Sequence, residues 1–356
     1  MTLLLSDDDV RATVSMAEAV AELEDAYRQL AAGHGTQRPR SDSFAATARP
    51  GTLFKLSSTD AIAPGLGVAA IRVSTGFYAW TEGPSGGRRE KDVDTGAARP
   101  TPTGLVLLFS TATGELLAVL RDDALSVLRL GATNAIAASY LAARDASVVA
   151  LLGCGRQAGG LLEGLATVSR LERVRCFSPT AARREAFAQR WSAALGIEVE
   201  PVASAREAVR GASIVQCATN STAGVLSGDW IEPGMHVASI RAHELDAGAL
   251  RRIGRLVVFV HDAVAQAHAA DGVPIPERDA ARGWREAGVD LAALPQLTDL
   301  VAGRAGRAAP DEVTGFLNTI GSAYQFAVLG AIAHRRAAQA GRGRELATAW
   351  FSETAD

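Results

Sequence analysis

The sequence lacks the features that mark several large classes of protein. Its 356 residues include only three cysteines, Cys154, Cys176 and Cys217, which form no Cys-x-x-Cys pair. We therefore expect neither a disulfide scaffold nor a cysteine zinc site. No apolar run reaches the roughly 18–20 residues of a membrane span, and residues 1–9 lack the basic and apolar regions of a signal peptide. The formal charge of −3 argues against nucleic acid as the main partner. We expect a cytoplasmic protein that binds neither membrane nor nucleic acid.

The second half of the chain has the pattern of an α/β fold. The length suggests two domains at about 150 residues each. From residue 147 onward, short apolar runs alternate with segments of helical length. The runs that we predict to be strands cover residues 148–152, 174–177, 213–217, 236–240 and 256–260. This alternation predicts a parallel, doubly wound sheet of the Rossmann type.

The rest of the chain predicts a second, α+β region. Its predicted elements are helices at 7–33, 123–143 and 318–339, strands at 52–57 and 67–74, and a hairpin at 105–109 and 116–119. Ser15 and Glu18 have the spacing of a helix capping box. Residues 77–100 are rich in charge and turn formers, which predicts a long loop. Such a loop is either a functional lid or a surface insertion.

A glycine-rich turn follows the first predicted strand of the parallel sheet. Residues 153–158 read Gly-Cys-Gly-Arg-Gln-Ala and open a helix. Gly153 permits the tight turn, Gly155 leaves room for a pyrophosphate, and Ala158 lets the helix pack closely on the strand. Backbone N–H groups at the start of the helix can then bind the phosphates. The pattern predicts a dinucleotide site, and the alternative is a tight turn with no ligand.

The end of the second predicted strand bears on the choice between NAD and NADP. NAD sites usually place an acidic residue there, whereas NADP sites lack the acid and offer an arginine. Residues 175–180 contain no acid, and Ser178, Thr180 and Arg183 can bind a 2′-phosphate. We favour NADP(H) as the cofactor and leave NAD(H) open, because the arginine can equally belong to a solvated helix start.

Polar side chains near other predicted strands suggest further site residues. Thr219 and Asn220 follow the third strand, where they could contact the nicotinamide ribose or cap the next element. His243 follows the fourth strand and is our first candidate for a proton donor, with a structural or surface role as the alternative. Lys55 is the second candidate, with a salt bridge or a solvated position as the alternative.

Several motifs, in this order, resemble the ornithine cyclodeaminase/mu-crystallin family. They are Leu125-Ser-Val-Leu-Arg-Leu-Gly-Ala132, Tyr140-Leu-Ala-Ala-Arg144, Gly153-Cys-Gly-Arg-Gln-Ala158, Leu300-Val-Ala-Gly-Arg304 and Phe316-Leu-Asn-Thr-Ile-Gly321. The resemblance implies a Rossmann domain inserted into a substrate-binding and dimerisation domain. It assigns residues 124–317 to the dinucleotide domain, and residues 1–123 with 318–356 to the second domain. It also implies a homodimer.

The resemblance implies roles for single residues as well. Arg40 corresponds to an arginine that holds the substrate carboxylate, and Arg129 to one near both the pyrophosphate and the substrate. Asn318 falls where the last helix approaches the nicotinamide. The cofactor contacts implied in this way are Thr101, Arg129, Gly153, Gly155, Arg156, Gln157, Ala158 and Asn318.

Two departures from the family's pattern argue against cyclodeaminase chemistry. Arg72 occupies the position of the family's catalytic lysine, after Gly65-Leu-Gly-Val68. An arginine binds a carboxylate well, but it stays protonated and is a poor base near neutral pH. Residues 238–245 also lack the aspartate that the cyclodeaminases carry after the fourth strand.

We therefore expect an NAD(P)-dependent oxidoreductase that transfers hydride to or from an imine or 2-oxo group of an anionic, amino-acid-like substrate. Arg40, Arg72 and Arg129 would bind the substrate, and Arg72, His243 and Lys55 are the candidate catalytic residues. An ornithine cyclodeaminase-type ammonia lyase with recycled NAD and a non-catalytic NADP-dependent ligand-binding protein are the alternatives. We expect no metal site, since no His-Glu-x-x-His motif occurs.

Overall fold

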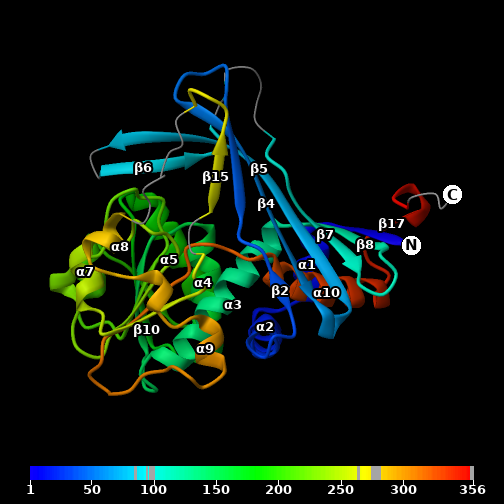
Figure 1. Ribbon diagram of the computed structural model, residues 1–356. Helices are drawn as coiled ribbons and strands as arrows, with labels where there is room; N and C mark the ends of the chain where they lie inside the picture. The colour runs from blue at the N-terminus through cyan, green and yellow to red at the C-terminus, as the bar shows by residue number, and fades with distance from the viewer. Residues whose placement is uncertain (84–85, 94, 96–100, 263–264, 274–281, 353–356) are drawn as a thin grey trace.

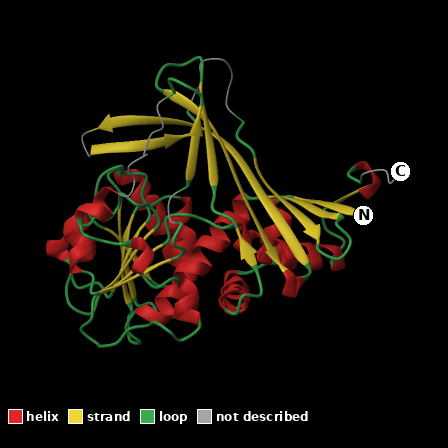
Figure 2. Cartoon of the chain, viewed as in Figure 1, coloured by secondary structure: helices red, strands yellow, loops and turns green. Residues whose placement is uncertain are grey.

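The computed structural model describes residues 1–83, 86–93, 95, 101–262, 265–273 and 282–352. Two β-sheets organise this part of the chain (Figure 1, Figure 2). One is a parallel sheet surrounded by helices, and the other is a mixed sheet with long strands that extend to one side. No described helix is long and apolar enough to cross a membrane.

The parallel sheet confirms the predicted Rossmann-type fold. Its strand order is β11-β10-β9-β12-β13-β16-β14, and every neighbouring pair is parallel. The strands are β9 (Val148–Leu152), β10 (Arg173–Phe177), β11 (Glu198–Pro201), β12 (Ile214–Cys217), β13 (His236–Ser239), β14 (Arg255–Val258) and β16 (Thr314–Leu317). The helices of this region are α3 (Asp123–Leu141), α4 (Arg156–Val168), α5 (Ala181–Leu195), α6 (Ala205–Val209), α7 (Ala247–Arg252), α8 (Arg282–Glu286) and α9 (Leu297–Val301). Strand β9 lies next to both β10 and β12, so the glycine-rich turn emerges where the strand order reverses.

The mixed sheet has the order β15-β3-β4-β5-β7-β8-β1-β17, with β2 paired to β4 and β6 paired to β5. Its strands are β1 (Thr2–Leu5), β2 (Thr36–Gln37), β3 (Ser41–Ala46), β4 (Thr52–Ala63), β5 (Val68–Gly83), β6 (Gly86–Lys91), β7 (Gly104–Ser110), β8 (Leu116–Arg121), β15 (Gln266–Ala269) and β17 (Arg344–Leu346). Helices α1 (Asp7–Thr13), α2 (Met16–Ala31) and α10 (Ala323–Gln339) belong to this region. Helix α10 packs on β4 and β5 and also contacts α2 and α3, so one apolar core joins the sheet to these helices.

The predicted N-terminal helix is two helices in the structure. Ser15 begins α2, where its backbone N–H donates to Glu18 Oε2 at 2.9 Å and its hydroxyl accepts from the Glu18 N–H at 3.3 Å. This capping box confirms the predicted start signal. The continuous helix over 7–33 is wrong, because the cap at Ser15 requires an extended backbone between α1 and α2.

The predicted loop at 77–100 is also wrong over much of its length. Strand β5 continues to Gly83 and returns as β6, with Tyr78 opposite Lys91 and Trp80 opposite Arg89. Charged residues on an edge strand are compatible with pairing, and they discourage the edge from aggregating. Residues 84–85, 94 and 96–100 lie outside the described residues, so a lid role for this segment stays a prediction.

Two further elements differ from the sequence prediction. The last helix begins at Ala323 rather than near residue 318, because Thr314–Leu317 form the buried strand β16 between β13 and β14. Strand β15 lies inside the range assigned to the dinucleotide domain, yet it pairs with β3 of the mixed sheet. The division into residues 124–317 and the rest of the chain stays a prediction. Strand β15 does not follow it, because its residues fall in the first part and its pairing is with the second.

Candidate functional site

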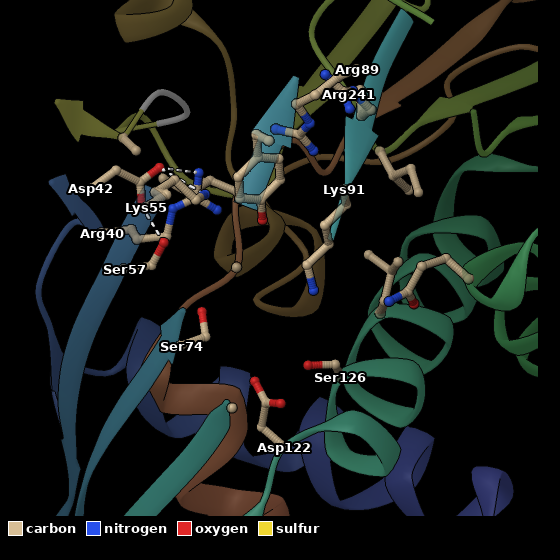
Figure 3. Close-up of a pocket in the computed structure, with 18 of the residues that line it drawn as sticks. Arg40, Asp42, Lys55, Ser57, Ser74, Arg89, Lys91, Asp122, Ser126 and Arg241 are labelled. Atoms are coloured by element: carbon tan, nitrogen blue, oxygen red, sulfur yellow. Dashed lines mark hydrogen bonds and ion pairs between the residues drawn. The ribbon is translucent and has the colours of Figure 1, made fainter. Parts of the chain in front are cut away.

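A cavity of about 850 Å³ lies between the mixed sheet and the carboxyl ends of β12, β13 and β16 (Figure 3). Among the described residues that line it, nine are cationic and four are carboxylates. The cations are Arg40, Lys55, Arg72, Arg89, Lys91, Arg121, Arg129, Arg156 and Arg241, and the carboxylates are Asp42, Asp92, Asp122 and Asp123. The excess of positive charge suits an anionic ligand.

The glycine-rich turn has the geometry of a phosphate-binding loop. Gly153 has a φ of +117°, and a Cβ there would lie 2.2 Å from the carbonyl oxygen of Ala218. Gly155 caps α4 without a side chain, and a Cβ there would meet no atom within 4 Å. Ala158 is fully buried against the sheet. The first N–H groups of α4 thus lack side-chain caps beside open space, which fits the diphosphate of a dinucleotide.

The residues predicted to select NADP lie around the start of α5. Thr180 is the N-cap residue, and its side chain makes no capping hydrogen bond. Arg183 is exposed, whereas Arg184 donates to the carbonyl oxygen of Ser178 at 3.1 Å. Strand β10 ends at Phe177 and Ser178 follows, so no acidic side chain stands at the end of this strand. The arrangement is compatible with a 2′-phosphate, and the preference for NADP stays a prediction.

Buried Glu244 holds together the loops that follow β12 and β13. It accepts hydrogen bonds from the Thr219 hydroxyl at 3.0 Å, from the Ile240 N–H at 2.9 Å and from the Arg241 N–H at 3.0 Å, and it also accepts from the Thr219 N–H. Burial raises the pKa of Glu244, which these donors oppose. Sequence reasoning missed this role, because the donors come from two loops that are distant in the chain.

The loop that follows β12 joins the two sheets. The Asn220 amide donates to the carbonyl oxygen of Arg89 at 3.1 Å, and the Arg89 N–H donates to the carbonyl oxygen of Asn220 at 2.9 Å. Thr219 and Asn220 line the cavity, as predicted for cofactor contacts. Their side chains are already bonded within the protein, so any ribose contact stays a prediction.

Arg72 and Arg129 both line the cavity, but their electrostatic settings differ. Arg72 forms an ion pair with buried Asp122, in which its Nε lies 2.8 Å from Oδ2. Arg129 packs over the ring of Phe326, 5.7 Å from its centroid. Burial, and next the like charge of Arg72, lowers the pKa of Arg129 to about 10. No described carboxylate lies within ion-pair distance of Arg129, so this guanidinium is a candidate ligand for an external anion.

A second charged cluster lies on the mixed sheet (Figure 3). Asp42 accepts hydrogen bonds from Arg40 at 3.1 Å, from Lys55 Nζ at 3.3 Å and from the Ser57 hydroxyl at 2.6 Å. Burial disfavours the Asp42 carboxylate, but the charges of Arg40 and Lys55 and the Ser57 bond outweigh it and lower its pKa. Sequence reasoning missed Asp42, because its partners come from positions that only the strand register aligns.

Lys55 has an unusual environment for a lysine. It is 8% exposed, and its Nζ lies 4.9 Å from the centroid of the Tyr78 ring. Burial, followed by the nearby charge of Arg40, lowers its pKa to about 7, although Asp42 opposes the shift. A pKa near 7 suits a general acid or base that works near neutral pH.

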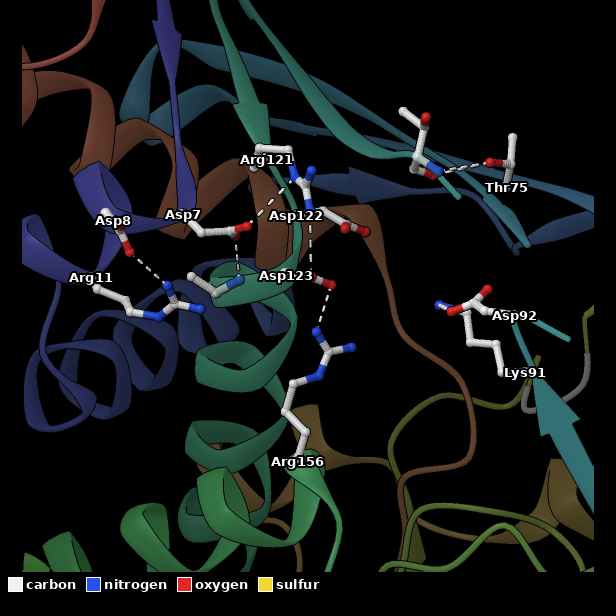
Figure 4. Close-up of polar contacts among 12 residues, drawn as sticks. Asp7, Asp8, Arg11, Thr75, Lys91, Asp92, Arg121, Asp122, Asp123 and Arg156 are labelled. Atoms are coloured by element: carbon white, nitrogen blue, oxygen red, sulfur yellow. Dashed lines mark hydrogen bonds and ion pairs between the residues drawn. The ribbon is translucent and has the colours of Figure 1, made fainter. Parts of the chain in front are cut away.

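The other predicted site residues are placed as follows. His243 and Asn318 line the cavity after β13 and β16, and Gln157 lines it at the start of α4. Arg156 also lines it and pairs with Asp123 at 2.7 Å, at the end of a chain of ion pairs through Arg121 to Asp7 (Figure 4).

Thr101 is exposed and does not line the cavity, whereas Pro102 and Thr103 beside it do. The structure therefore does not bring Thr101 to the site. No group of three potential metal ligands gathers in the part of the chain that the structure describes.

The parallel sheet, its reversal at β9 and the glycine-rich turn define an α/β protein with a Rossmann-type dinucleotide-binding fold. The model of the ornithine cyclodeaminase/mu-crystallin family matches residues 87–337. The chain belongs to this family, as its motifs indicated.

Comparison with known proteins gives the same assignment. A provisionally named dehydrogenase of Rhizobium meliloti is 30% identical over 356 residues, which cover 96% of this chain and 97% of that protein. A Delta(1)-pyrroline-2-carboxylate reductase of Bacillus cereus is 28% identical over 254 residues, which cover 70% of this chain and 75% of that protein. The structure resembles that of Thermococcus litoralis Delta(1)-pyrroline-2-carboxylate reductase in complex with NADH and L-proline, with a TM-score of 0.81, 25% identity and coverage of 97% and 100% of the two chains.

Proposed function

We propose that the protein is a nicotinamide-nucleotide-dependent reductase that acts on the imine or 2-oxo group of an anionic, amino-acid-like substrate. One observation carries this proposal: a cavity with excess positive charge contains a buried lysine whose pKa lies near 7, and the start of α4 borders the same space. The similarity to Delta(1)-pyrroline-2-carboxylate reductases supports it. The reverse reaction, oxidation of the amine or hydroxyl product, would use the same cavity and the same lysine.

The arginines of the cavity hold the substrate carboxylate in this proposal. Arg129 is the principal anchor, because its guanidinium has no described carboxylate partner and substrate binding would compensate its buried charge. Arg40, directly before β3, contributes a second cation, although it is shared with Asp42. Arg72 holds Asp122 in place and is a weaker anchor for the substrate, because its charge is already paired.

Lys55 supplies the proton in the reductive direction. When bound, the nicotinamide coenzyme would supply the hydride. A nitrogen or oxygen atom that receives a proton needs a donor whose pKa is close to the working pH. Lys55 meets this condition, and Asp42 holds its Nζ in place at 3.3 Å. His243 is the second candidate for this role, from the opposite side of the cavity.

We infer that NADP(H) is the preferred coenzyme and that NAD(H) can also bind. The support is the absence of an acid after β10, together with Thr180 and exposed Arg183 at the start of α5. We also infer a homodimer, since an archaeal alanine dehydrogenase of the same fold, with a TM-score of 0.76, is described as a dimer.

The lyase alternative has less support from the site. Cyclodeaminases of this family carry an aspartate after the fourth strand, and here the loop contains Glu244 and Asp246. Glu244 accepts hydrogen bonds from two loops, and Asp246 caps α7 by accepting from the Ala249 N–H at 2.6 Å. Both carboxylates serve the local structure, so neither is available as a base in the cavity.

The test is coenzyme oxidation with a panel of candidate substrates. NADPH and NADH are each supplied with Delta(1)-pyrroline-2-carboxylate, its six-membered homologue, and 2-oxo acids with ammonia or an amine. We expect absorbance at 340 nm to fall with at least one of them, faster with NADPH. Ammonia release from ornithine without net coenzyme consumption would instead support the lyase. Tight ligand binding with no turnover across the panel would support a binding protein.

A further inference from the structure

A relay of three buried amides leads from the core of the parallel sheet to the cavity. Gln216 lies on β12, Asn134 lies on α3, and Asn318 directly follows β16. Each of these residues is at most 2% exposed. Asn318 Nδ2 donates to Asn134 Oδ1 at 2.9 Å, and Asn134 Nδ2 donates to Gln216 Oε1 at 3.1 Å. Of these three described residues, Asn318 is the one that lines the cavity.

The inner end of the relay fixes which way each amide faces. Gln216 Nε2 donates to the carbonyl oxygens of Cys217 at 2.9 Å and of Ala238 at 3.3 Å. A carbonyl oxygen only accepts hydrogen bonds, so the nitrogen of Gln216, and not its oxygen, must face these two groups. The oxygen of Gln216 therefore faces Asn134, which must meet it with its nitrogen, and the same reasoning holds from Asn134 to Asn318. Turning any one amide by 180° would bring two acceptors or two donors together.

The relay leaves the oxygen of Asn318 unsatisfied. This Oδ1 is buried and has no hydrogen-bond partner in the part of the chain that the structure describes. Buried polar atoms in native proteins are seldom left in this state, because the loss of hydration is not compensated. The amide cannot turn to relieve it, since its nitrogen is bound to Asn134. An N–H donor from a ligand in the cavity would satisfy this oxygen.

The position of Asn318 favours the coenzyme as the source of the donor. Strands β9, β12, β13 and β16 are parallel neighbours, so the glycine-rich turn and Asn318 lie at the same edge of the sheet. A dinucleotide with its diphosphate on the turn after β9 extends along this edge, across the point where the strand order reverses. Its nicotinamide carries a carboxamide, and the NH2 group of an amide has two N–H donors.

We propose that Asn318 Oδ1 accepts a hydrogen bond from the carboxamide NH2 of the nicotinamide, and that Asn134 and Gln216 are positioning residues that keep this oxygen available. This inference rests on the proposed function, because it requires a nicotinamide coenzyme. A held carboxamide restricts rotation of the ring about its bond to the ribose. One face of the ring is then presented to the substrate, as hydride transfer requires.

The experiment measures coenzyme binding by calorimetry in the absence of substrate. NADP+ and NAD+ are each compared with their 3-acetylpyridine analogue, in which a methyl group replaces the NH2 and the carbonyl remains. We expect the natural coenzyme that binds more tightly to exceed its analogue in affinity about tenfold, because the analogue leaves Asn318 Oδ1 without a donor. Equal affinities would overturn the inference and leave the proposed function intact. If neither coenzyme binds, the proposed function itself fails.

Two substitutions at Asn134 separate orientation from packing. Asn134→Leu has a similar volume but interrupts the relay, so the Asn318 amide is free to turn and the preference should fall from about tenfold to about threefold or less. Asn134→Asp is the matched control. As the neutral acid, which burial favours, it still accepts from Asn318 and donates to Gln216, so the preference should persist at pH 6. A merely structural role for Asn134 would weaken both coenzymes by the same factor in Asn134→Leu, and that result would overturn the relay.

Gln216→Met tests the relay from its other end, and it serves if Asn134→Leu does not fold. It removes the group that fixes every amide, so the preference should fall here as well, and a preference retained in this variant would overturn the positioning role.

A last comparison asks whether the donor belongs to the substrate instead. Pyrrole-2-carboxylate and furan-2-carboxylate differ in one ring N–H, and each is titrated into the coenzyme-loaded protein. A preference for the pyrrole that disappears in Asn318→Leu, without discrimination between coenzyme and analogue, would assign the oxygen to the substrate and overturn the proposal.

Discussion

Replacing Lys55 with methionine tests the proposed proton donor, because it keeps the length of the side chain and removes its ionisable group. The pKa of Lys55 is lowered to about 7 by burial and by Arg40. In the reductive direction the ammonium form is active, so kcat/KM should be constant below about pH 6 and fall tenfold per pH unit above pH 7. The rate at pH 9 should then be about 100-fold below the plateau. Oxidation of the product needs the neutral amine of Lys55, so the rate of the oxidative reaction should rise with pH through the same range.

The assay is steady-state turnover between pH 5 and 10 with the best substrate of the panel. A coenzyme deuterated at the transferred position shows whether hydride transfer limits the rate. Lys55→Met should lower kcat by about 10²- to 10⁴-fold and remove the break in the profile near pH 7. An unchanged break in Lys55→Met would refute the assignment and direct attention to His243.

Two neighbouring substitutions should move the break in opposite directions. Asp42 raises the pKa of Lys55 and Arg89 lowers it. Asp42→Asn should therefore shift the break below pH 7, and Arg89→Gln should shift it above pH 7. Shifts in the same direction would show that the break belongs to another group. Each variant needs an unchanged thermal transition before its profile is interpreted.

Three further predictions concern binding. Arg129→Met should raise KM by about 10- to 100-fold, because a charge-assisted carboxylate contact is lost; an unchanged KM measured by steady-state kinetics would contradict the anchor. Gly153→Ala should lower Tm and coenzyme affinity, because its Cβ would lie 2.2 Å from the Ala218 oxygen, whereas Gly155→Ala should reduce calorimetric coenzyme affinity with Tm unchanged. Arg183→Ala should weaken NADPH binding about tenfold and leave NADH binding unaffected. Equal losses of affinity for the two coenzymes would remove the argument for a phosphate site.

Much of the fold could be predicted because its signals are local. The strands β9, β10, β12, β13 and β14 each appear as a short apolar run, and their limits lie within about two residues of the prediction. The conformation of Gly153 and the capping box at Ser15 depend on a few neighbouring residues, so they too could be recognised. The strand β6 escaped recognition because its charged residues resemble a loop, and its pairing partner decides its conformation.

The chemistry of the site depends on contacts that no local pattern contains. The sequence by itself determined the dinucleotide turn, the parallel sheet and the family. Only the tertiary structure decided that Asp42 from β3 meets Lys55 from β4, that Asp122 neutralises Arg72, and that Arg129 faces the cavity without a described counterion. The reason is physical: a backbone conformation follows from adjacent residues, whereas the charge state of a side chain follows from burial and from every charge around it.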